Sequence, residues 1–459
     1  MESSNDVSSN GRLGDSAMEG DVNLSPLRAE WQARHIGPST RGVLEEDAKH
    51  FLHQSLSTPC LNALAEANGI YLTDIEGRRL IDFHGNNVHQ VGYRNSRVIA
   101  AVREALDTLP FSPRRFTNQY AVDLAARLTT LAPGNLNKVL FAPGGTEAVG
   151  MALKLARAVT GRHKTVSMWD SFHGASLDAI SIGGEALFRK NSGPLLAGTE
   201  HAPPCDPRAC LYGCGGACNA RCADYVEYIL AKEEDVGAVI VETVRCTDVQ
   251  IPPAEYYMRL RASCDRHGAL LILDEIPIGL GRTGRMFAFE HYDIIPDMVV
   301  LGKGLGGGVW PMAALIVRDN LDVAGGQALG HYTHEKSSVG CAAALATLDC
   351  LELDGLLVRA ISIGNSIKTR LDELRKSVAL ISEVRCIGAL VGVELALPDG
   401  KPASHEAERV MYECLSNGLS FKIGQGNVLN LSPPLIINDE ELDKGLSILE
   451  QALRLVAAS

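Results

Sequence analysis

The stretch Met298-Val299-Val300-Leu301-Gly302-Lys303-Gly304-Leu305-Gly306-Gly307-Gly308 decides the fold, because a lysine set among glycines follows a short apolar run. An apolar run of this length, bounded by glycine, is typical of a buried strand. Glycines allow backbone conformations that strain other residues, and they let another group come close. Packing explains a lysine there poorly, whereas a lysine that forms a Schiff base with a cofactor fits the position. A phosphate-binding loop or an ordinary turn would also fit this segment alone.

Similar apolar runs occur on both sides of this stretch. A Gly-rich turn and a helical pattern over residues 147–159 follow the first run, and polar residues close the others. Strands that alternate with helices predict a mostly parallel central sheet covered on both faces. Ligands bind beyond the carboxyl ends of such strands, so the polar residues found there are the candidates for a site. The runs are Val139–Phe141, Thr165–Met168, Val239–Val241, Leu270–Leu273 and Ala313–Val317.

Three of the predicted strand ends carry groups suited to a flat, phosphorylated cofactor. Asp274 follows one run, and a carboxylate buried there needs a partner, which a protonated ring nitrogen, a helix terminus or a salt bridge could provide. Gly144-Gly145-Thr146 lies between a strand and a helix, where exposed amides and a hydroxyl can hold an anion. Phe172-His173-Gly174 offers an aromatic ring for stacking. Each feature alone also occurs in proteins that bind nothing, so the specificity lies in their order and spacing.

That order and spacing resemble the class III (omega) aminotransferases, and the resemblance extends from about Gly69 to Pro434. It implies an α/β fold of fold-type I, in which a large domain with a central, mostly parallel sheet is joined to a small α+β domain. It also implies pyridoxal 5'-phosphate as cofactor, a small-molecule amine as substrate, and a homodimer with shared active sites. The motifs that carry the resemblance are Ala142–Ala148, Ser171–Gly174, Leu273–Glu275, Gly281–Gly284, Pro296-Asp297 and Gly302–Gly304.

The resemblance further implies a role for each matching residue. Lys303 would hold the cofactor covalently, Asp274 would pair with its ring nitrogen, and Phe172 would stack on the ring. Thr333 matches a threonine that reaches the phosphate in the neighbouring subunit, and Glu242 matches a strand-end glutamate near the substrate. The implied catalytic residues are Lys303, Asp274 and Glu242, and the implied cofactor-binding residues are Gly145, Thr146, Phe172, His173, Asp274, Lys303 and Thr333.

Two departures from the family pattern argue against ordinary transamination, although amine transaminases can bind acceptors by other means. Members that use 2-oxoglutarate often carry an arginine where this chain has Asn430, and a neutral amide cannot bind a carboxylate as a guanidinium does. Pro277 replaces a glutamine of the usual motif and has no amide side chain. In addition, residues 83–92 and 110–118 are similar to a narrower group of lyases that degrade an amino-alcohol phosphonate.

A lyase of this kind would release ammonia without an oxo-acid acceptor. Lys303 would remove a proton from the amine-bearing carbon, and the β-hydroxyl would leave as water after protonation by His173, Lys303 or His334. Hydrolysis would then yield phosphonoacetaldehyde and ammonia. The alternative is a class III aminotransferase that acts on a primary amine or amino acid with an oxo-acid acceptor.

A phosphonate substrate requires nearby cations, and the sequence offers several. Arg114 and Arg115 are adjacent in a loop with two prolines, and Arg245 lies three residues after Glu242. Guanidinium groups suit a dianionic head group, although surface arginines paired with carboxylates are an equally ordinary interpretation. Asn87, in an Asn-Asn-Val segment shared with lyases of the family, completes the predicted substrate-binding residues.

Composition narrows the class of protein. The 459 residues carry a formal net charge of −12, which argues against a nucleic-acid partner. No apolar stretch reaches the roughly 18 residues of a membrane span, and no basic and apolar start indicates secretion. We therefore expect a cytoplasmic enzyme with no membrane partner.

The same composition suggests how the chain is divided. We expect a disordered tail over residues 1–23, a small domain formed by residues 24–80 with 345–459, and a large domain over 81–344. A hairpin is predicted over residues 69–77. Five of the twelve cysteines fall in a Cys-rich insert, residues 205–222, without the paired spacing of common zinc sites. A thiol-bearing surface loop is the favoured interpretation and a metal site the alternative, so no metal is predicted.

Overall fold

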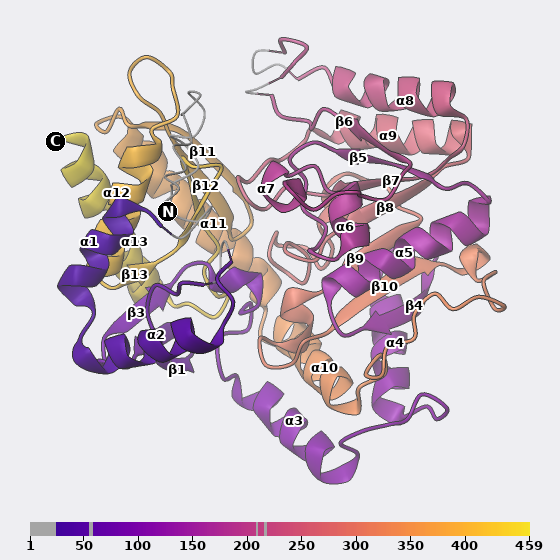
Figure 1. Ribbon diagram of the computed structural model, residues 1–459, viewed down its shortest axis with the longest axis horizontal. Coiled ribbons are helices and arrows are strands. Elements are labelled where there is room, and N and C mark those ends of the chain that lie inside the picture. The colour runs from indigo at the N-terminus through magenta and orange to yellow at the C-terminus, as the bar shows by residue number, and fades with distance from the viewer. Residues whose placement is uncertain (1–23, 55–57, 208–209, 215–217) are drawn as a thin grey trace, which may run out of the picture.

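The computed structural model describes residues 24–54, 58–207, 210–214 and 218–459, so the predicted tail, residues 1–23, lies outside the described residues. Figure 1 shows two parts side by side. Helices and strands from both ends of the chain gather in one part, and the middle of the chain builds the other. The two ends of the chain are therefore brought together although they are distant in sequence.

A seven-stranded sheet forms the centre of the larger part, with the order β4-β10-β9-β8-β7-β5-β6. Five strands, β6, β5, β7, β8 and β9, pair with one another in parallel. The strand β10 is antiparallel to both of its neighbours, β4 and β9. Each apolar run identified in the sequence lies within one of these strands, and the predicted mostly parallel sheet is confirmed. The strands are β4 (Leu136–Ala142), β5 (Lys164–Met168), β6 (Thr199–Ala202), β7 (Val236–Glu242), β8 (Leu270–Asp274), β9 (Met298–Leu301) and β10 (Ala313–Arg318).

Alternate residues of the central strands face opposite sides of the sheet, as the two-residue period of a strand requires. Ala238, Ile240 and Ile272 pack with α5 (Gly145–Thr160) on one face. Val239, Val241, Leu271 and Leu273 belong to the core on the other face. There α9 (Ala254–His267) packs against β8, and α8 (Arg221–Glu233) packs against β6 and α9. Burial of both faces explains why the strands are continuously apolar.

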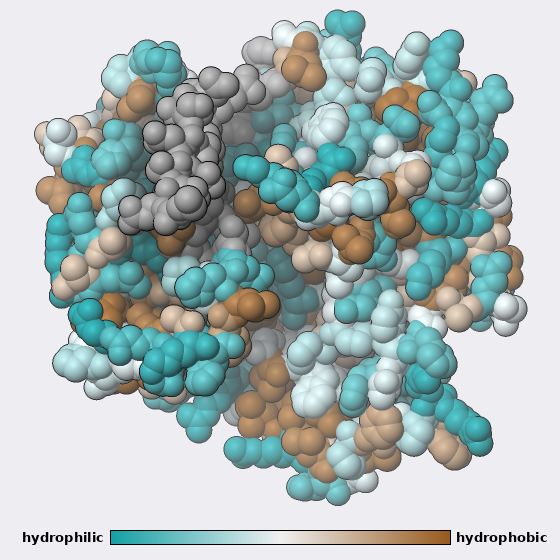
Figure 2. Space-filling view, viewed as in Figure 1, coloured by the Kyte–Doolittle hydropathy of each residue, from teal (hydrophilic) through white to brown (hydrophobic). Residues whose placement is uncertain are grey.

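Two short helices and three longer ones complete the larger part. The helix α10 packs against α3 and α4. Figure 2 shows apolar side chains gathered on the surface over α3 and α10, on a face that is otherwise largely hydrophilic. These helices are α3 (Ser96–Thr108), α4 (Gln119–Leu131), α6 (Leu177–Ile182), α7 (Ala186–Arg189) and α10 (Ser338–Leu353).

The smaller part contains two four-stranded sheets, with the orders β1-β2-β3-β13 and β11-β12-β15-β14. In the first, β13 pairs in parallel with β3, and Leu419 lies opposite Ile81. The predicted hairpin over residues 69–77 is too short, because successive turns at Gly69 and Gly77 join three strands. The strands are β1 (Leu64–Asn68), β2 (Tyr71–Asp74), β3 (Arg79–Asp82), β11 (Ile381–Ile387), β12 (Leu390–Leu395), β13 (Leu419–Ser420), β14 (Lys422–Gly424) and β15 (Val428–Leu431).

Five helices cover these sheets: α1 (Pro26–His35), α2 (Pro38–His50), α11 (Leu356–Arg375), α12 (Ser404–Ser416) and α13 (Asp439–Ala457). The strand β3 crosses the predicted domain boundary after residue 80, and α10 crosses the one after residue 344. The division into domains at those residues stays a prediction. In the described residues no helix is long and apolar enough to span a membrane.

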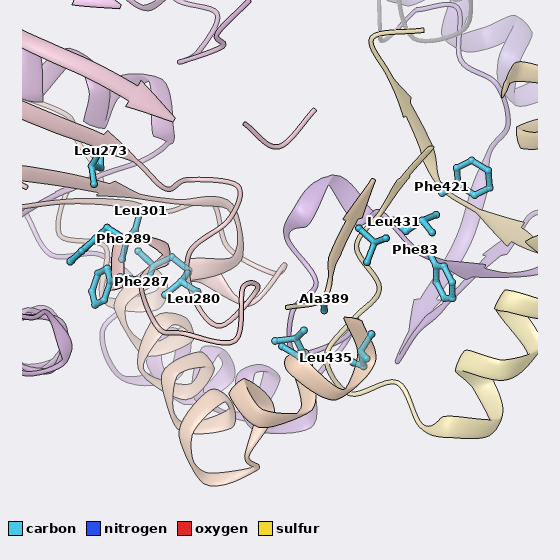
Figure 3. Close-up of a cluster of buried hydrophobic side chains, with 14 of the residues drawn as sticks. Phe83, Leu273, Leu280, Phe287, Phe289, Leu301, Ala389, Phe421, Leu431 and Leu435 are labelled. Carbon is cyan, nitrogen blue, oxygen red and sulfur yellow. The ribbon is translucent and has the colours of Figure 1, made fainter. Parts of the chain in front are cut away.

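Apolar side chains connect the two parts. In Figure 3, Leu301, at the end of β9, and Leu280, in a loop after β8, lie on one side, and Phe83 lies on the other. Ala389 and Leu435 lie between them, and all five residues are buried. The carboxyl ends of the central strands are thereby fixed against the smaller part, which is where the site lies.

Candidate active site

Lys303 begins the short 3-10 helix η4 (Lys303–Gly306), two residues after β9 ends. Its φ of 46° lies in the left-handed region, which costs a residue with a Cβ about 1–2 kcal/mol. A Cβ at the next residue, Gly304, would meet the amide of the buried Gln90 side chain, which would have to move. The backbone around Lys303 is therefore held in a strained form, which is common where a side chain must be presented to a ligand.

Asp274 ends β8 beside Lys303's strand and is buried. Its Oδ2 lies 2.8 Å from Nδ1 of His173, and its Oδ1 accepts a hydrogen bond from the Ile276 amide. Glu242 ends the next strand, β7, directly opposite Asp274. Its two oxygens accept hydrogen bonds from the backbone amides of Phe172 and Cys246. Burial raises the pKa of Glu242. Two neighbouring strand ends thus carry buried carboxyl groups.

The N-terminus of α5 lies beside the same strand ends. Ile276 lies two residues after Asp274, and its side chain packs closely against Gly145 and Gly302. A Cβ on either glycine would come too close to that side chain. Thr146 Oγ1 lies 2.6 Å from Ser176 Oγ, in the loop that follows His173. No side chain caps this 16-residue helix at Gly144. Free amides at a long helix N-terminus suit a phosphate group.

A cavity of about 350 Å³ opens next to Lys303. Four of the predicted site residues line it, namely Asn87, Phe172, Glu242 and Lys303. The β14–β15 hairpin of the smaller part forms another wall. The lining residues are His84, Asn86, Asn87, Phe172, Glu185, Leu187, Phe188, Glu242, Cys246, Thr247, Pro277, Lys303, Lys422, Ile423, Gly424, Gln425, Gly426 and Asn430.

Two charged lining residues, Glu185 and Lys422, escaped prediction from the sequence. Glu185 precedes α7, and burial, followed by the nearby Glu242, raises the pKa of Glu185 to about 7. Lys422 is exposed, lines the cavity and forms no ion pair within the described residues. Burial and the positive charge of Lys422 hold the pKa of His84 well below its usual range. The cavity therefore contains an ammonium group without an ion-pair partner among the described residues, together with a carboxyl group whose pKa lies near neutral pH.

Two buried amides complete the wall. Asn87 donates to Cys246 Sγ at 3.1 Å, and Asn430 donates to the Cys246 carbonyl. The Oδ1 atoms of both side chains have no hydrogen-bond partner among the described residues. A buried polar atom without a partner is costly, so a substrate that donates a hydrogen bond here would be stabilised.

Arg245 does not line this cavity. Its Nε and Nη2 atoms both donate to Asp248, and its Nη1 lies 3.8 Å from Asp170. It borders instead a separate small cavity that it shares with Glu242. A guanidinium already held by a bidentate carboxylate is poorly placed to bind a second anion.

Arg114, Arg115 and Thr333 are exposed and lie outside the cavity of their own chain. Their two segments pack together: the ring of Phe111 lies 5.3 Å from that of His334. The Asn118 side chain also donates to the carbonyl of Lys336. Any contact of these three residues with the site must therefore come from another copy of the chain or from movement of this surface.

The site residues fit pyridoxal phosphate. Lys303 is presented by a strained backbone, Asp274 is a buried carboxylate oriented by His173, and α5 offers free amides at neighbouring strand ends. Phe172 is 36% exposed and its ring lies 4.4 Å from that of Phe188, so an aromatic face is available to a flat ring. A covalent anchor, a partner for a ring nitrogen and a phosphate cradle thus occur in one place.

The Cys-rich insert is described only in part, because residues 208–209 and 215–217 lie outside the described residues. Cys205 Sγ lies 3.8 Å from Cys218 Sγ, and Cys210 Sγ lies 2.9 Å from Cys214 Sγ. Among the residues the structure describes, no group of three or more His, Cys, Asp or Glu side chains is arranged to hold a metal ion.

Residues 53–453 match the model of the aminotransferase class-III family, and the chain belongs to this family. It is 49% identical to (R)-1-hydroxy-2-aminoethylphosphonate ammonia-lyase from Vibrio splendidus, over 95% of this chain and 94% of that protein. These matches confirm the resemblance inferred from the motifs.

Solved structures agree with the assignment. A transaminase from the marine bacterium Virgibacillus superimposes with a TM-score of 0.84 at 26% identity, covering 91% of this chain and 99% of that one. An amine transaminase from an uncultivated Pseudomonas species, in its PLP-bound form, superimposes with a TM-score of 0.82 at 30% identity. That alignment covers 88% of this chain and 98% of the other. The predicted fold-type I architecture is thereby confirmed.

Proposed function

We propose that this chain is a pyridoxal-phosphate-dependent lyase that converts (R)-1-hydroxy-2-aminoethylphosphonate into phosphonoacetaldehyde and ammonia. The observation that carries the proposal is the 49% identity, over nearly the whole of both chains, to a lyase of that name. The cofactor is supported by the fit of the site and by the PLP-bound family member. A class III transaminase acting on a primary amine with an oxo acid is the alternative.

In the proposed reaction, the cofactor acts as an electron sink for the electron pair left when the amine-bearing carbon loses a proton. Lys303 borders the cavity and accepts that proton at Nζ. Asp274, held by His173, keeps a cofactor ring nitrogen protonated. The hydroxyl of the neighbouring carbon takes up the proton held at Lys303 Nζ and leaves as water, and hydrolysis of the released product returns a water oxygen to form the aldehyde. The net change is loss of ammonia.

The cavity wall lacks two groups with which many transaminases of the family bind an oxo acid or the cofactor. Asn430 directs its amide inward, to the Cys246 carbonyl, and leaves no guanidinium at the position where many transaminases have one. Pro277 lines the cavity at the place of the usual glutamine and has no side-chain donor. Bidentate binding of an α-carboxylate at Asn430 is therefore lost.

The proposed enzyme is a cytoplasmic homodimer with shared active sites. Its partner is a small amine, here a phosphonate, and it binds neither nucleic acid nor a membrane. Thr333, Arg114 and Arg115 support a shared site, because they lie together on the surface and away from their own chain's cavity. In this arrangement they complete the cavity of the other subunit.

The test mixes purified, cofactor-loaded protein with 1-hydroxy-2-aminoethylphosphonate and no oxo acid. Sustained release of ammonia and aldehyde over many turnovers is the expected result. A single turnover that resumes when pyruvate is added would instead identify a transaminase. The Lys303→Ala variant is the matched control, since it should release nothing under either function.

A further inference from the structure

We propose that Lys422 is the residue that binds the anionic head group of the substrate and so selects phosphonate-bearing amines. The inference rests on the proposed function and adds a specificity-determining residue to it. Neither the sequence motifs nor the family match points to this lysine. It comes from the way the β14–β15 hairpin is set against the cavity.

The first observation is the register of that hairpin. Lys422 on β14 lies directly opposite Asn430 on β15 in an antiparallel pair. Directly opposed residues of an antiparallel pair project from the same face of the sheet. Both residues line the cavity, so the ammonium group of Lys422 stands beside the position from which an acceptor-binding arginine is missing. In this chain the cation therefore lies on β14, opposite the position on β15 where many transaminases of the family have an arginine.

The second observation is that the hairpin is fixed in place. A Cβ at Gly424 would collide with the carbonyl of Thr247, so β14 lies in close contact with the segment after β7. The amide of Asn430 donates to the Cys246 carbonyl in the same segment. Both strands of the hairpin therefore contact the segment after β7, and this contact defines where Lys422 enters the cavity.

The third observation concerns charge. Four charged residues line the cavity, namely Glu185, Glu242, Lys303 and Lys422. Glu242 has both oxygens bound by backbone amides, and Lys303 is committed to the cofactor. Lys422 forms no ion pair among the described residues. Glu185 lines the same cavity, and because burial raises its pKa to about 7, it is neutral at lower pH and offsets the charge of Lys422 only at higher pH. A phosphonate is the chemical group that this cation suits.

The other predicted cations of the same chain are less available. Arg245 is bound by Asp248 through two hydrogen bonds, and Arg114 and Arg115 lie outside the cavity. Lys422 is thus the cation that a single subunit presents to its own substrate. Arginines from a second subunit would add to it rather than replace it.

The experiment compares the cofactor-loaded wild type with Lys422→Met, Lys422→Arg and the exposed control Lys401→Met. Two quantities are measured: the KM for 1-hydroxy-2-aminoethylphosphonate and the calorimetric Kd of methylphosphonate, which needs no turnover. We expect Lys422→Met to raise both about 10- to 100-fold, the size of a lost hydrogen bond to a charged group. Lys422→Arg should restore most of the binding, and Lys401→Met should match the wild type. 1-Amino-2-propanol, which lacks the phosphonate, should be used equally by all variants.

The outcomes separate this inference from the proposed function. A wild type that binds methylphosphonate through Lys422 but releases no ammonia would support the inference while overturning the lyase. An active wild type whose KM and methylphosphonate Kd are unchanged in Lys422→Met would overturn the inference and leave the lyase standing. Wild type that does not bind methylphosphonate at all would also overturn it.

Discussion

His173 Nδ1 lies 2.8 Å from Asp274 Oδ2, and both residues are only 2% exposed. A buried carboxylate held by a histidine is well suited to keep a cofactor ring nitrogen protonated, because the surrounding protein supplies little other solvation. The loop after β5 and the end of β8 must both be in place for this contact. The electronic state of the cofactor therefore depends on two elements that are far apart in the chain.

We expect Asp274→Asn to reduce turnover by about 10²–10⁴-fold, the usual contribution of a positioned proton-transfer group. His173→Leu should cost less, about 10- to 100-fold, because the Ile276 amide still donates to Asp274. Ammonia release and the visible absorbance of the cofactor are the measurements. The exposed His405→Leu is the control, and a His173→Leu enzyme as active as that control would contradict the assigned role.

The backbone of Lys303 leads to a prediction about stability. Its φ of 46° is strained for any residue with a Cβ, so glycine should be favoured over alanine there. In the cofactor-free protein we expect the free energy of unfolding of Lys303→Gly to be about 1 kcal/mol higher than that of Lys303→Ala, so the glycine variant is the more stable one. Urea denaturation measures the difference.

A matched pair at Lys154, within α5, should show the opposite order, since glycine destabilises a helix by about 1 kcal/mol relative to alanine. If glycine were the less stable substitution at both positions, the strained conformation of Lys303 would be refuted. The comparison is independent of catalysis, because neither variant at position 303 can hold the cofactor covalently.

The sequence predicted the central sheet and the residues at its strand ends because both are local features. An apolar run followed by Asp274 or Lys303 is visible within a few residues, and the fold only has to keep the strands side by side. The parallel pairing of β13 with β3 was not predictable in this way, because it joins the two ends of the chain. Two-residue strands such as β13 also leave almost no periodic pattern to detect.

The site residues that escaped prediction came from tertiary contacts. Lys422 belongs to no motif, although the glycines at 424 and 426 mark a hairpin whose register would have placed it opposite Asn430. Glu185 lies in a loop, where spacing carries little information. Arg245 was predicted to bind substrate, but an aspartate three residues later holds it, and that spacing was visible in the sequence.

Glu185 should make substrate binding depend on pH. Burial raises the pKa of Glu185 to about 7, so the carboxyl group is neutral below that pH and becomes negative above it. A negative Glu185 pairs with Lys422 and repels a phosphonate. We therefore expect the KM for the phosphonate to rise several-fold from about pH 6 to about pH 8 in the wild type, and to rise less in Glu185→Gln.

The comparison at each pH removes the titration of the phosphonate itself, which is the same for both enzymes. Glu440→Gln, on the exposed surface of α13, is the control and should follow the wild type. Identical pH profiles for the wild type and Glu185→Gln would show that Glu185 does not face the head group.

Shared active sites can be tested by mixing two inactive variants. Lys303→Ala lacks the residue that holds the cofactor, and the double variant Arg114→Met, Arg115→Met should bind the phosphonate weakly. If the arginines reach the other subunit, a mixed dimer contains one site with an intact Lys303 from one chain and intact arginines from its partner. We expect part of the wild-type ammonia release to return when the two variants are unfolded, mixed and refolded together.

The alternative arrangement gives a different result. If Arg114 and Arg115 act within their own chain, each site of a mixed dimer still lacks either the lysine or the arginines, and no activity returns beyond that of the separate variants. Lys303→Ala mixed with wild type controls for refolding. Phe111 and Asn118 hold the arginine loop against the segment that carries Thr333. Recovery of activity would therefore place Thr333, together with the arginines, at the neighbouring subunit's site.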